Sequence, residues 1–216
     1  MKYLIILFLT TNLYAAEYIY EEKTGENTEQ VIVIIEKLED GFIVNNKSES
    51  YNSTYWLDRE YNLESYETLL ADGNFIEFYK KIDKIFDGNN NPIHQFDPTE
   101  DLWIEDTTNM KSFIISDLET IFFFVIGPNY KMDGSYKEGD YAHMALKAKK
   151  VKREVLEING VQIETVKVMM TTKSAIMSLF WKAYYWYRVS DGIIVYYEDT
   201  KGPGAPRTYG TLIDER

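Results

Sequence analysis

The chain has no cysteine and only five prolines among its 216 residues. Disulfides are therefore excluded, although exported domains often carry them, so the core must be held together by packing alone. A lipid-anchored N-terminus requires a cysteine directly after a cleavage point, so we expect no such anchor. Aromatic and other hydrophobic residues are plentiful, at 15% and 45% of the chain, which is ample material for a core.

Basic residues are also scarce relative to acidic ones. The chain has 23 lysines and arginines against 35 aspartates and glutamates, which gives a formal net charge of −12. An acidic protein repels a phosphate backbone, so nucleic acid is not expected as a partner.

No apolar run is long enough to cross a bilayer, but the one near the start has informative flanks. Lys2 supplies a positive charge, Tyr3–Leu9 is apolar, and the small residues Ala15 and Ala16 precede the acidic Glu17. This order is typical of a secretory signal peptide, and the apolar run is too short to cross a bilayer. The sequence predicts a signal peptide over residues 1–16 and a periplasmic or secreted mature chain that does not span a membrane.

Motifs for catalysis or cofactor binding are missing. His94 and His143 lie far apart with no cysteine to complete a metal site, and there is neither a nucleophile elbow nor a glycine-rich phosphate loop. We expect no metal, no cofactor and no catalytic residues. A hydrolase that uses two carboxylates stays open, because acidic residues are abundant.

Turn signals divide the chain into hairpins. Asp-Gly and Asn-Gly pairs accept the positive φ angles of tight hairpin turns, and four of the six are flanked by apolar strands. Since no helices alternate with these strands, the sequence predicts one antiparallel β-rich domain over residues 17–216. The four turns with strands on both sides are Asp40-Gly41, Asp72-Gly73, Asn159-Gly160 and Asp191-Gly192.

One helix is predicted, over residues 117–126. Ser116 and Glu119 have the spacing of a capping box, an apolar run follows, and Gly127 and Pro128 stop it. The run is apolar on nearly all sides, which favours burial. Either the helix packs in the hollow of a curved sheet, or one edge of the sheet clasps it.

The last predicted hairpin is aromatic on both faces. Pairing about Asp191-Gly192 would place Tyr187 opposite Tyr196 and Trp186 opposite Tyr197. One face is core, and the other is either covered by a further element or lines a pocket. For a pocket, the predicted ligand-lining residues are Tyr184, Trp186, Tyr197, Phe122 and Phe124.

A basic run stands out in this acidic chain. Pairing about Asn159-Gly160 would place Lys152 opposite Lys167, a slightly unfavourable arrangement. The run is either a solvated face or a docking patch for anionic lipid headgroups or an acidic partner. Its residues are Lys147, Lys149, Lys150, Lys152 and Arg153.

Three segments carry a resemblance to known proteins: DLETIFFFVIG, VLEINGVQIETVKV and WYRVSDGIIVYYE. They resemble an uncharacterised family of bacterial exported β-rich proteins, which is similar in fold to the periplasmic carriers of outer-membrane lipoproteins. The resemblance implies a curved antiparallel sheet, an open half-barrel wrapped around a helix, with acyl chains bound in the hollow. It implies no catalytic residues.

These observations lead to one expected function and one main alternative. We expect a non-enzymatic exported protein that holds a hydrophobic or lipid-like ligand in the half-barrel hollow. The alternative is a structural or adaptor protein of the cell envelope that meets its partner through a sheet edge or the basic run.

Overall fold

The computed structural model describes residues 15–60, 62–81, 84–90, 92–95, 120–128, 141–179, 181–200 and 206–216. Within these ranges the chain is all β apart from one short 3₁₀ helix, η2 (Met177–Leu179). The strands are β1 (Ala15–Thr24), β2 (Asn27–Lys37), β3 (Gly41–Lys47), β4 (Tyr51–Asp58), β5 (Leu63–Leu70), β6 (Phe75–Lys81), β7 (Lys84–Asp87), β8 (Pro92–Gln95), β9 (Thr120–Pro128), β10 (Tyr141–Ile158), β11 (Val161–Thr172), β12 (Lys182–Arg188), β13 (Ile194–Thr200) and β14 (Arg207–Glu215).

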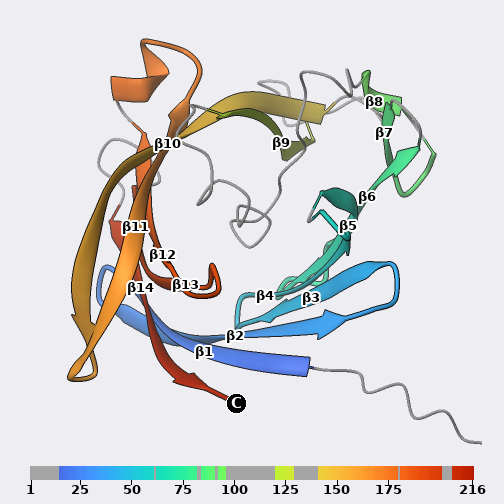
Figure 1. Cartoon of the computed structure of the whole chain (residues 1–216). Coiled ribbons are helices and arrows are strands. Elements are labelled where there is room, and N and C mark those ends of the chain that lie inside the picture. The colour runs from blue at the N-terminus through green and yellow to red at the C-terminus, as the bar shows by residue number, and fades with distance from the viewer. Residues whose placement is uncertain are drawn as a thin grey trace, which may run out of the picture.

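These strands form one open antiparallel sheet in the order β8-β7-β6-β5-β4-β3-β2-β1-β14-β13-β12-β11-β10-β9. Chain neighbours are sheet neighbours except for β8 and β9, which form the two edges of the sheet. The pairing of β1 with β14 joins the N-terminal and C-terminal runs of strands. The sheet curves until its edge strands β8 and β9 come to the same side of the molecule (Figure 1). The predicted curved, open antiparallel sheet is confirmed.

The predicted hairpins form at all four turns. At the tip of the β10–β11 hairpin, Asn159 and Gly160 have φ angles of 53° and 78°, both in the left-handed region that asparagine and glycine tolerate best. The predicted register is confirmed, because Ile158 pairs with Val161. Further along, Lys152 pairs with Lys167 as expected.

The predicted helix over residues 117–126 is wrong. Residues 120–128 form β9, an edge strand that pairs with β10, while the proposed capping residues lie outside the described part of the chain. The cause is a run in which nearly every residue is apolar, since such a run has no periodicity that separates helix from strand. Its β-branched and aromatic content then favours a pleated strand.

The predicted register of the last hairpin is also wrong. Trp186 pairs with Tyr196, and Tyr185 pairs with Tyr197. The turn is longer than two residues, because the Arg188 amide donates to the Ile193 carbonyl at 2.7 Å, and a bulge follows between Trp186 and Tyr187. A one-residue slip exchanges the two faces of a strand, so Tyr197 lies on the opposite face from Trp186.

Successive pairs place most buried side chains on one face of the sheet, which we call the core face. It carries Tyr20 and Val31 as a cross-strand pair, and Val44 opposite Tyr55. In the C-terminal half a second cluster occupies the same face. Tyr185 pairs with Tyr197, Tyr197 with Gly210, and Gly210 with Glu22, so these residues lie side by side across four strands and share one face. The buried members of that cluster are Leu146, Ala148, Val166, Val168, Met170, Ala183, Tyr185 and Tyr187.

A tyrosine joins the two halves of the sheet on the core face. The Tyr197 ring lies directly over Gly210, and its hydroxyl donates to Glu22 Oε2 at 2.5 Å. Burial, together with the nearby Glu22 carboxylate, raises the pKa of Tyr197, so the phenol stays protonated. Glycine at position 210 is required because any Cβ there would overlap the ring.

Strand β1 begins at Ala15, which pairs with Glu36 of β2. Residues 1–14 lie outside the described part of the chain, so the signal peptide stays a prediction. In the described residues no helix has the length and hydropathy needed to cross a membrane.

Candidate functional site

Strands β12 and β13 end before their neighbours do. The β11–β12 ladder stops where Thr165 pairs with Arg188, and the β13–β14 ladder stops where Tyr196 pairs with Thr211. Strand β14 continues to Glu215, and β11 starts four residues before its first β12 pair. The short turn between β12 and β13 therefore leaves a gap between the end of β14 and the start of β11.

A tyrosine side chain bonds to the start of β13 beside this gap. The Tyr20 hydroxyl donates to the Ile194 carbonyl at 2.8 Å, in place of a ladder bond from β14. In the described residues β14 then has a strand partner only on its β1 side, where Leu212 pairs with Tyr20 and Glu215 with Tyr18. The gap is thus bordered by two strand edges that lack ladder partners there.

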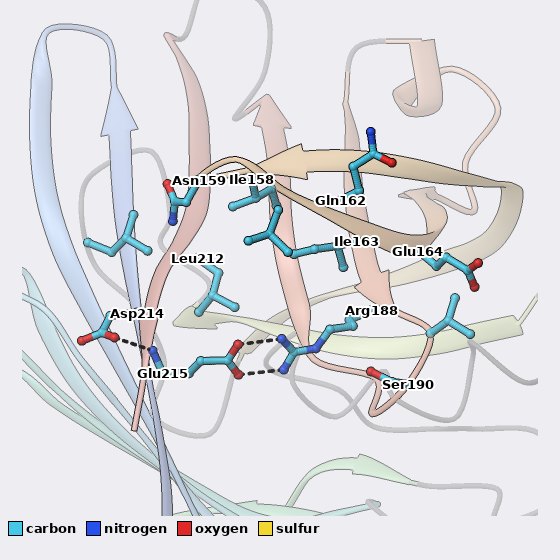
Figure 2. A pocket seen from close by; sticks show the side chains of 13 residues that line it. Ile158, Asn159, Gln162, Ile163, Glu164, Arg188, Ser190, Leu212, Asp214 and Glu215 are labelled. Atoms are coloured by element: carbon cyan, nitrogen blue, oxygen red, sulfur yellow. Dashed lines mark hydrogen bonds and ion pairs between the residues drawn. The ribbon is translucent and has the colours of Figure 1, made fainter.

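The gap is a groove of about 710 Å³. The tip of the β10–β11 hairpin lies on one side and the end of β14 on the other, with Arg188 and Glu215 along the lower wall (Figure 2). We call it the β14 groove. Its lining residues are Ile158, Asn159, Val161, Gln162, Ile163, Glu164, Arg188, Val189, Ser190, Leu212, Ile213, Asp214 and Glu215.

The groove has apolar walls. Ile158 and Leu212 are buried core residues at its base, whereas Val161 and Ile213 are exposed at its mouth, with 59% and 37% of their surface accessible. Large apolar side chains left in contact with water along a concavity indicate a binding surface. A second pocket, of about 510 Å³, has Ile32 as the single apolar residue in its lining.

Arg188 anchors the lower wall through two carboxylates. Its Nη1 and Nη2 atoms donate to Glu215 Oε1 and Oε2 at 2.7 and 2.8 Å. Nε and Nη2 donate to Asp191 Oδ1 and Oδ2 at 2.9 and 2.6 Å. The Arg188 side chain is only 17% exposed, so these bonds fix the β12–β13 turn to the end of β14.

The network determines the charge states of its members. Hydrogen bonds to Glu215, and then to Asp191, raise the pKa of Arg188. The hydrogen bond from Arg188 lowers the pKa of Glu215, which stays ionised and is unsuited to donate a proton. An incoming anion would meet a guanidinium already engaged by two carboxylates.

The groove is acidic overall. Glu164, Asp191, Asp214 and Glu215 supply four carboxylates at the groove and its rim. Arg188 and Arg216, which pairs with Asp214 at 2.9 Å, supply two cations, so the net charge is −2. The electrostatic field there favours a cation and disfavours an anionic headgroup.

The residues predicted to line a ligand pocket are divided between the two faces of the sheet. Tyr184 and Trp186 lie opposite the core face, where the Lys167 ammonium sits 4.2 and 4.1 Å from their ring centroids. Tyr197 lies on the core face. None of these three lines the β14 groove.

The two predicted lining residues in the former helix segment belong to β9. Phe122 pairs with Leu146 and Phe124 with Met144. Leu146 belongs to the C-terminal core cluster, and Met144 packs against it. These partners lie on the Tyr197 side of the sheet, away from Tyr184 and Trp186.

The basic run also divides between faces. Lys147, Lys149 and Lys152 pair with residues of the Lys167 face, whereas Lys150 and Arg153 pair with Val168 and Val166 on the core face. A bulge between Lys150 and Lys152 shifts the alternation. Lys152 forms an ion pair with Glu154 at 2.7 Å, which offsets its position opposite Lys167.

Sequence reasoning missed the β14 groove because four separate segments build it. Its positions depend on where the β12 and β13 ladders stop, and no local pattern encodes that. The available signal was Arg188 with Asp191 three residues on, beside a turn. Within the described residues no group of three histidine, cysteine or carboxylate side chains could hold a metal ion.

Comparison with known proteins gives structural neighbours only. No family model matches the chain, and no curated protein matches it. A hypothetical lipoprotein from Escherichia coli, YmcC, is 12% identical with a TM-score of 0.42, covering 93% of this chain and 87% of that one. A DUF1089 family protein from Pseudomonas aeruginosa is 9% identical with a TM-score of 0.40, covering 95% and 97%.

A domain described as an outer membrane lipoprotein-sorting protein domain, from Vibrio parahaemolyticus, is 9% identical with a TM-score of 0.28, covering 94% of this chain and 84% of that one. These neighbours are of the kinds named by the sequence resemblance, which is confirmed in that respect. At these TM-scores they carry no argument about a ligand, so the proposals below rest on the chain's own residues.

Proposed function

We propose that this chain is an exported, non-enzymatic binding protein that holds a hydrophobic or lipid-like ligand. The observation that carries the proposal is the β14 groove, where partly exposed apolar side chains converge from the β10–β11 hairpin and from β14. Its volume lies within the range of roughly 300–1,000 Å³ that is usual for ligand pockets.

The apolar walls supply the binding energy in this account. Val161 and Ile213 are about half and one-third exposed, so a ligand that covers them removes apolar surface from water at about 25 cal/mol per Å². The buried side chains of Ile158 and Leu212 form a rigid base, which limits the entropy lost on binding.

A binding role fits the carboxylates better than a hydrolytic one does. A general acid needs a raised pKa, whereas the pKa of Glu215 is lowered by Arg188. The ion network serves to hold the groove walls together, because Arg188 joins the β12–β13 turn to β14.

The test is a titration of the purified chain with N-phenyl-1-naphthylamine, a neutral apolar dye whose fluorescence rises on binding. We expect saturable binding that weakens about tenfold, or 1.4 kcal/mol, in the variant Val161→Gln with Ile213→Gln. The matched control is Val155→Gln, because Val155 is 55% exposed on the same hairpin but lies outside the groove. Equal dye affinity in all three proteins would refute the assignment.

A second candidate function is supported by the basic run. Lys149, Lys152 and Arg153 are exposed, and the neighbouring Val151 and Val155 are 49% and 55% exposed. An exposed strand that mixes basic and apolar side chains suits an adaptor that docks on anionic headgroups or an acidic partner.

Charge reversal separates the two functions. The adaptor function predicts that the variant Lys149→Glu with Lys150→Glu and Lys152→Glu no longer cosediments with phosphatidylglycerol vesicles. Its affinity for the dye should be unchanged. Cosedimentation that survives the reversal, or is absent from the unmodified chain, would refute headgroup docking.

A further inference from the structure

The geometry points to an extended segment of a partner protein, with alternating apolar and basic side chains, as the occupant of the β14 groove, where it adds a strand to β14. This inference rests on the proposed function because it uses the same groove. It goes further by naming the ligand as a peptide and by assigning its charge.

The first argument is the direction of the backbone groups of β14. Arg216 exchanges both backbone hydrogen bonds with Glu17, at 2.9 and 3.0 Å, so its N–H and C=O point toward β1. Backbone groups alternate in direction along an antiparallel strand. Those of Glu215 therefore point away from β1 and toward the groove, where no described strand pairs with them. A bulge at Ile213 interrupts the alternation further back along β14.

The opposite border of the groove repeats this arrangement. The Glu164 carbonyl points away from β10, because it accepts from the Val189 amide at 3.0 Å. By the same alternation the backbone groups of Gln162 also point away from β10, toward the groove that this residue lines. An apolar groove between two such edges suits an extended chain better than a compact ligand, because main-chain bonds then add to the apolar contacts.

The second argument is charge complementarity. Side chains of an added strand alternate between its two faces, so every second residue would meet the apolar walls and the others would meet the rim. The rim carries Glu164, Asp191, Asp214 and Glu215. Arg188 is committed to Asp191 and Glu215, and Arg216 Nε donates to Asp214 at 2.9 Å, so two negative charges remain in excess. Lysine or arginine at the rim positions complements this field, and acidic residues do not.

The same charges disfavour an anionic lipid in this groove. A phosphate headgroup would sit among carboxylates with no uncommitted arginine to receive it. A peptide with a basic rim face is thus favoured over an anionic amphiphile.

The experiment is a fluorescence polarisation titration of the full chain with a labelled peptide of alternating valine and lysine. We expect binding at low salt, with affinity at least tenfold higher than for peptides of alternating valine and glutamate or serine and lysine. Equal affinity for the valine–lysine and serine–lysine peptides would mean that charge attraction alone accounts for binding, and it would overturn the inference.

Two further measurements test the assigned contacts. The variant Glu164→Gln with Asp214→Asn should weaken peptide binding about fivefold, whereas Glu26→Gln with Glu60→Gln, two exposed turn positions, should not. Neither pair touches the Arg188 network. Two N-methylated peptides test the main-chain bonds, one methylated at the odd-numbered amides and one at the even-numbered amides, because each set removes the N–H donors from one edge of the peptide. We refer to them as the two N-methyl registers. The register that blocks the edge facing β14 should bind at least tenfold more weakly, and the other should keep its affinity.

Failure of the inference and failure of the proposed function give different results. If the dye binds in the groove but the peptide does not bind, or both N-methyl registers behave alike, the added strand is refuted and the hydrophobic ligand stands. If neither dye nor peptide responds to Val161→Gln with Ile213→Gln, the groove itself is not a binding site.

Discussion

The substitution Gly210→Ala tests the packing that joins the two halves of the sheet. A Cβ at this position would lie 2.0 Å from Cε1 and 2.1 Å from Cζ of Tyr197, well inside contact distance. The ring cannot move aside freely, because it stacks on Tyr185 with centroids 6.0 Å apart and its hydroxyl bonds to Glu22. The alanine must therefore displace a largely buried tyrosine.

The expected cost follows from two contributions. Forcing an extra methyl group into packed surroundings costs about 1–3 kcal/mol. Losing the Tyr197 hydrogen bond to the charged Glu22 adds roughly 1.5–3 kcal/mol. We expect Gly210→Ala to lower the free energy of unfolding by about 3–5 kcal/mol, measured by urea denaturation at neutral pH.

The control is the same substitution in a Tyr197→Ala background. There the clash is gone, and alanine in a strand is slightly better than glycine, so Gly210→Ala should be neutral or stabilising by about 0.5 kcal/mol. A loss below 1 kcal/mol in the unmodified chain, or the same loss in both backgrounds, would refute the reasoning.

Four further predictions concern the turn, the ion network, pH and the N-terminus. Gly160→Val should cost about 1–2 kcal/mol in urea denaturation because φ is 78° there, whereas Gly160→Asn should cost less. Arg188→Met should lower the free energy of unfolding by about 1–3 kcal/mol, because Asp191 and Glu215 would then face each other without a cation, although both are partly exposed. The folded-state pKa of Glu215 lies below its ordinary value of 4.5, so its contribution to stability is present above pH 4.5 and is lost as pH falls through the folded pKa; Glu215→Gln should flatten this part of the profile. Expression of the full sequence in a Gram-negative host should give a periplasmic product whose intact mass begins at Glu17, and a mass that includes the first sixteen residues would contradict the signal peptide.

The fold was largely predictable because turn chemistry is local. The Asn159-Gly160 pair predicted both the hairpin and its register, including the unfavourable Lys152–Lys167 pair. The Asp191-Gly192 pair predicted the hairpin but not the register, because Arg188 bonds with Asp191 and the amide of Ile193 bonds to the same carboxylate, which lengthens the turn.

The helix error has a different physical cause. The run from Ile121 to Ile126 is apolar at every position, so neither a 3.6-residue nor a 2-residue period can be recognised in it. Pairing with β10 then decides the structure, and no local pattern contains that pairing. A capping box stabilises a helix end by about 1 kcal/mol, which is little compared with a ladder of hydrogen bonds to β10.

The candidate site was not predictable from the sequence. Two of the aromatic residues chosen as a lining have partners within the sheet. Trp186 donates its indole N–H to Glu154 at 2.8 Å, and the Lys167 ammonium covers the rings of Trp186 and Tyr184. The groove arises instead where two ladders stop, which depends on contacts as distant in sequence as Tyr20 with Ile194.

Photolabelling tests the central claim most directly. A neutral apolar probe with a diazirine group is bound to the purified chain, activated by light, and located by peptide mass spectrometry. The account predicts labels on Val161 and Ile163 of the hairpin and on Leu212 and Ile213 of β14, reduced in the Val161→Gln variant with Ile213→Gln. Labels confined to the peptide that carries Tyr184 and Trp186, or spread evenly over the chain, would contradict it.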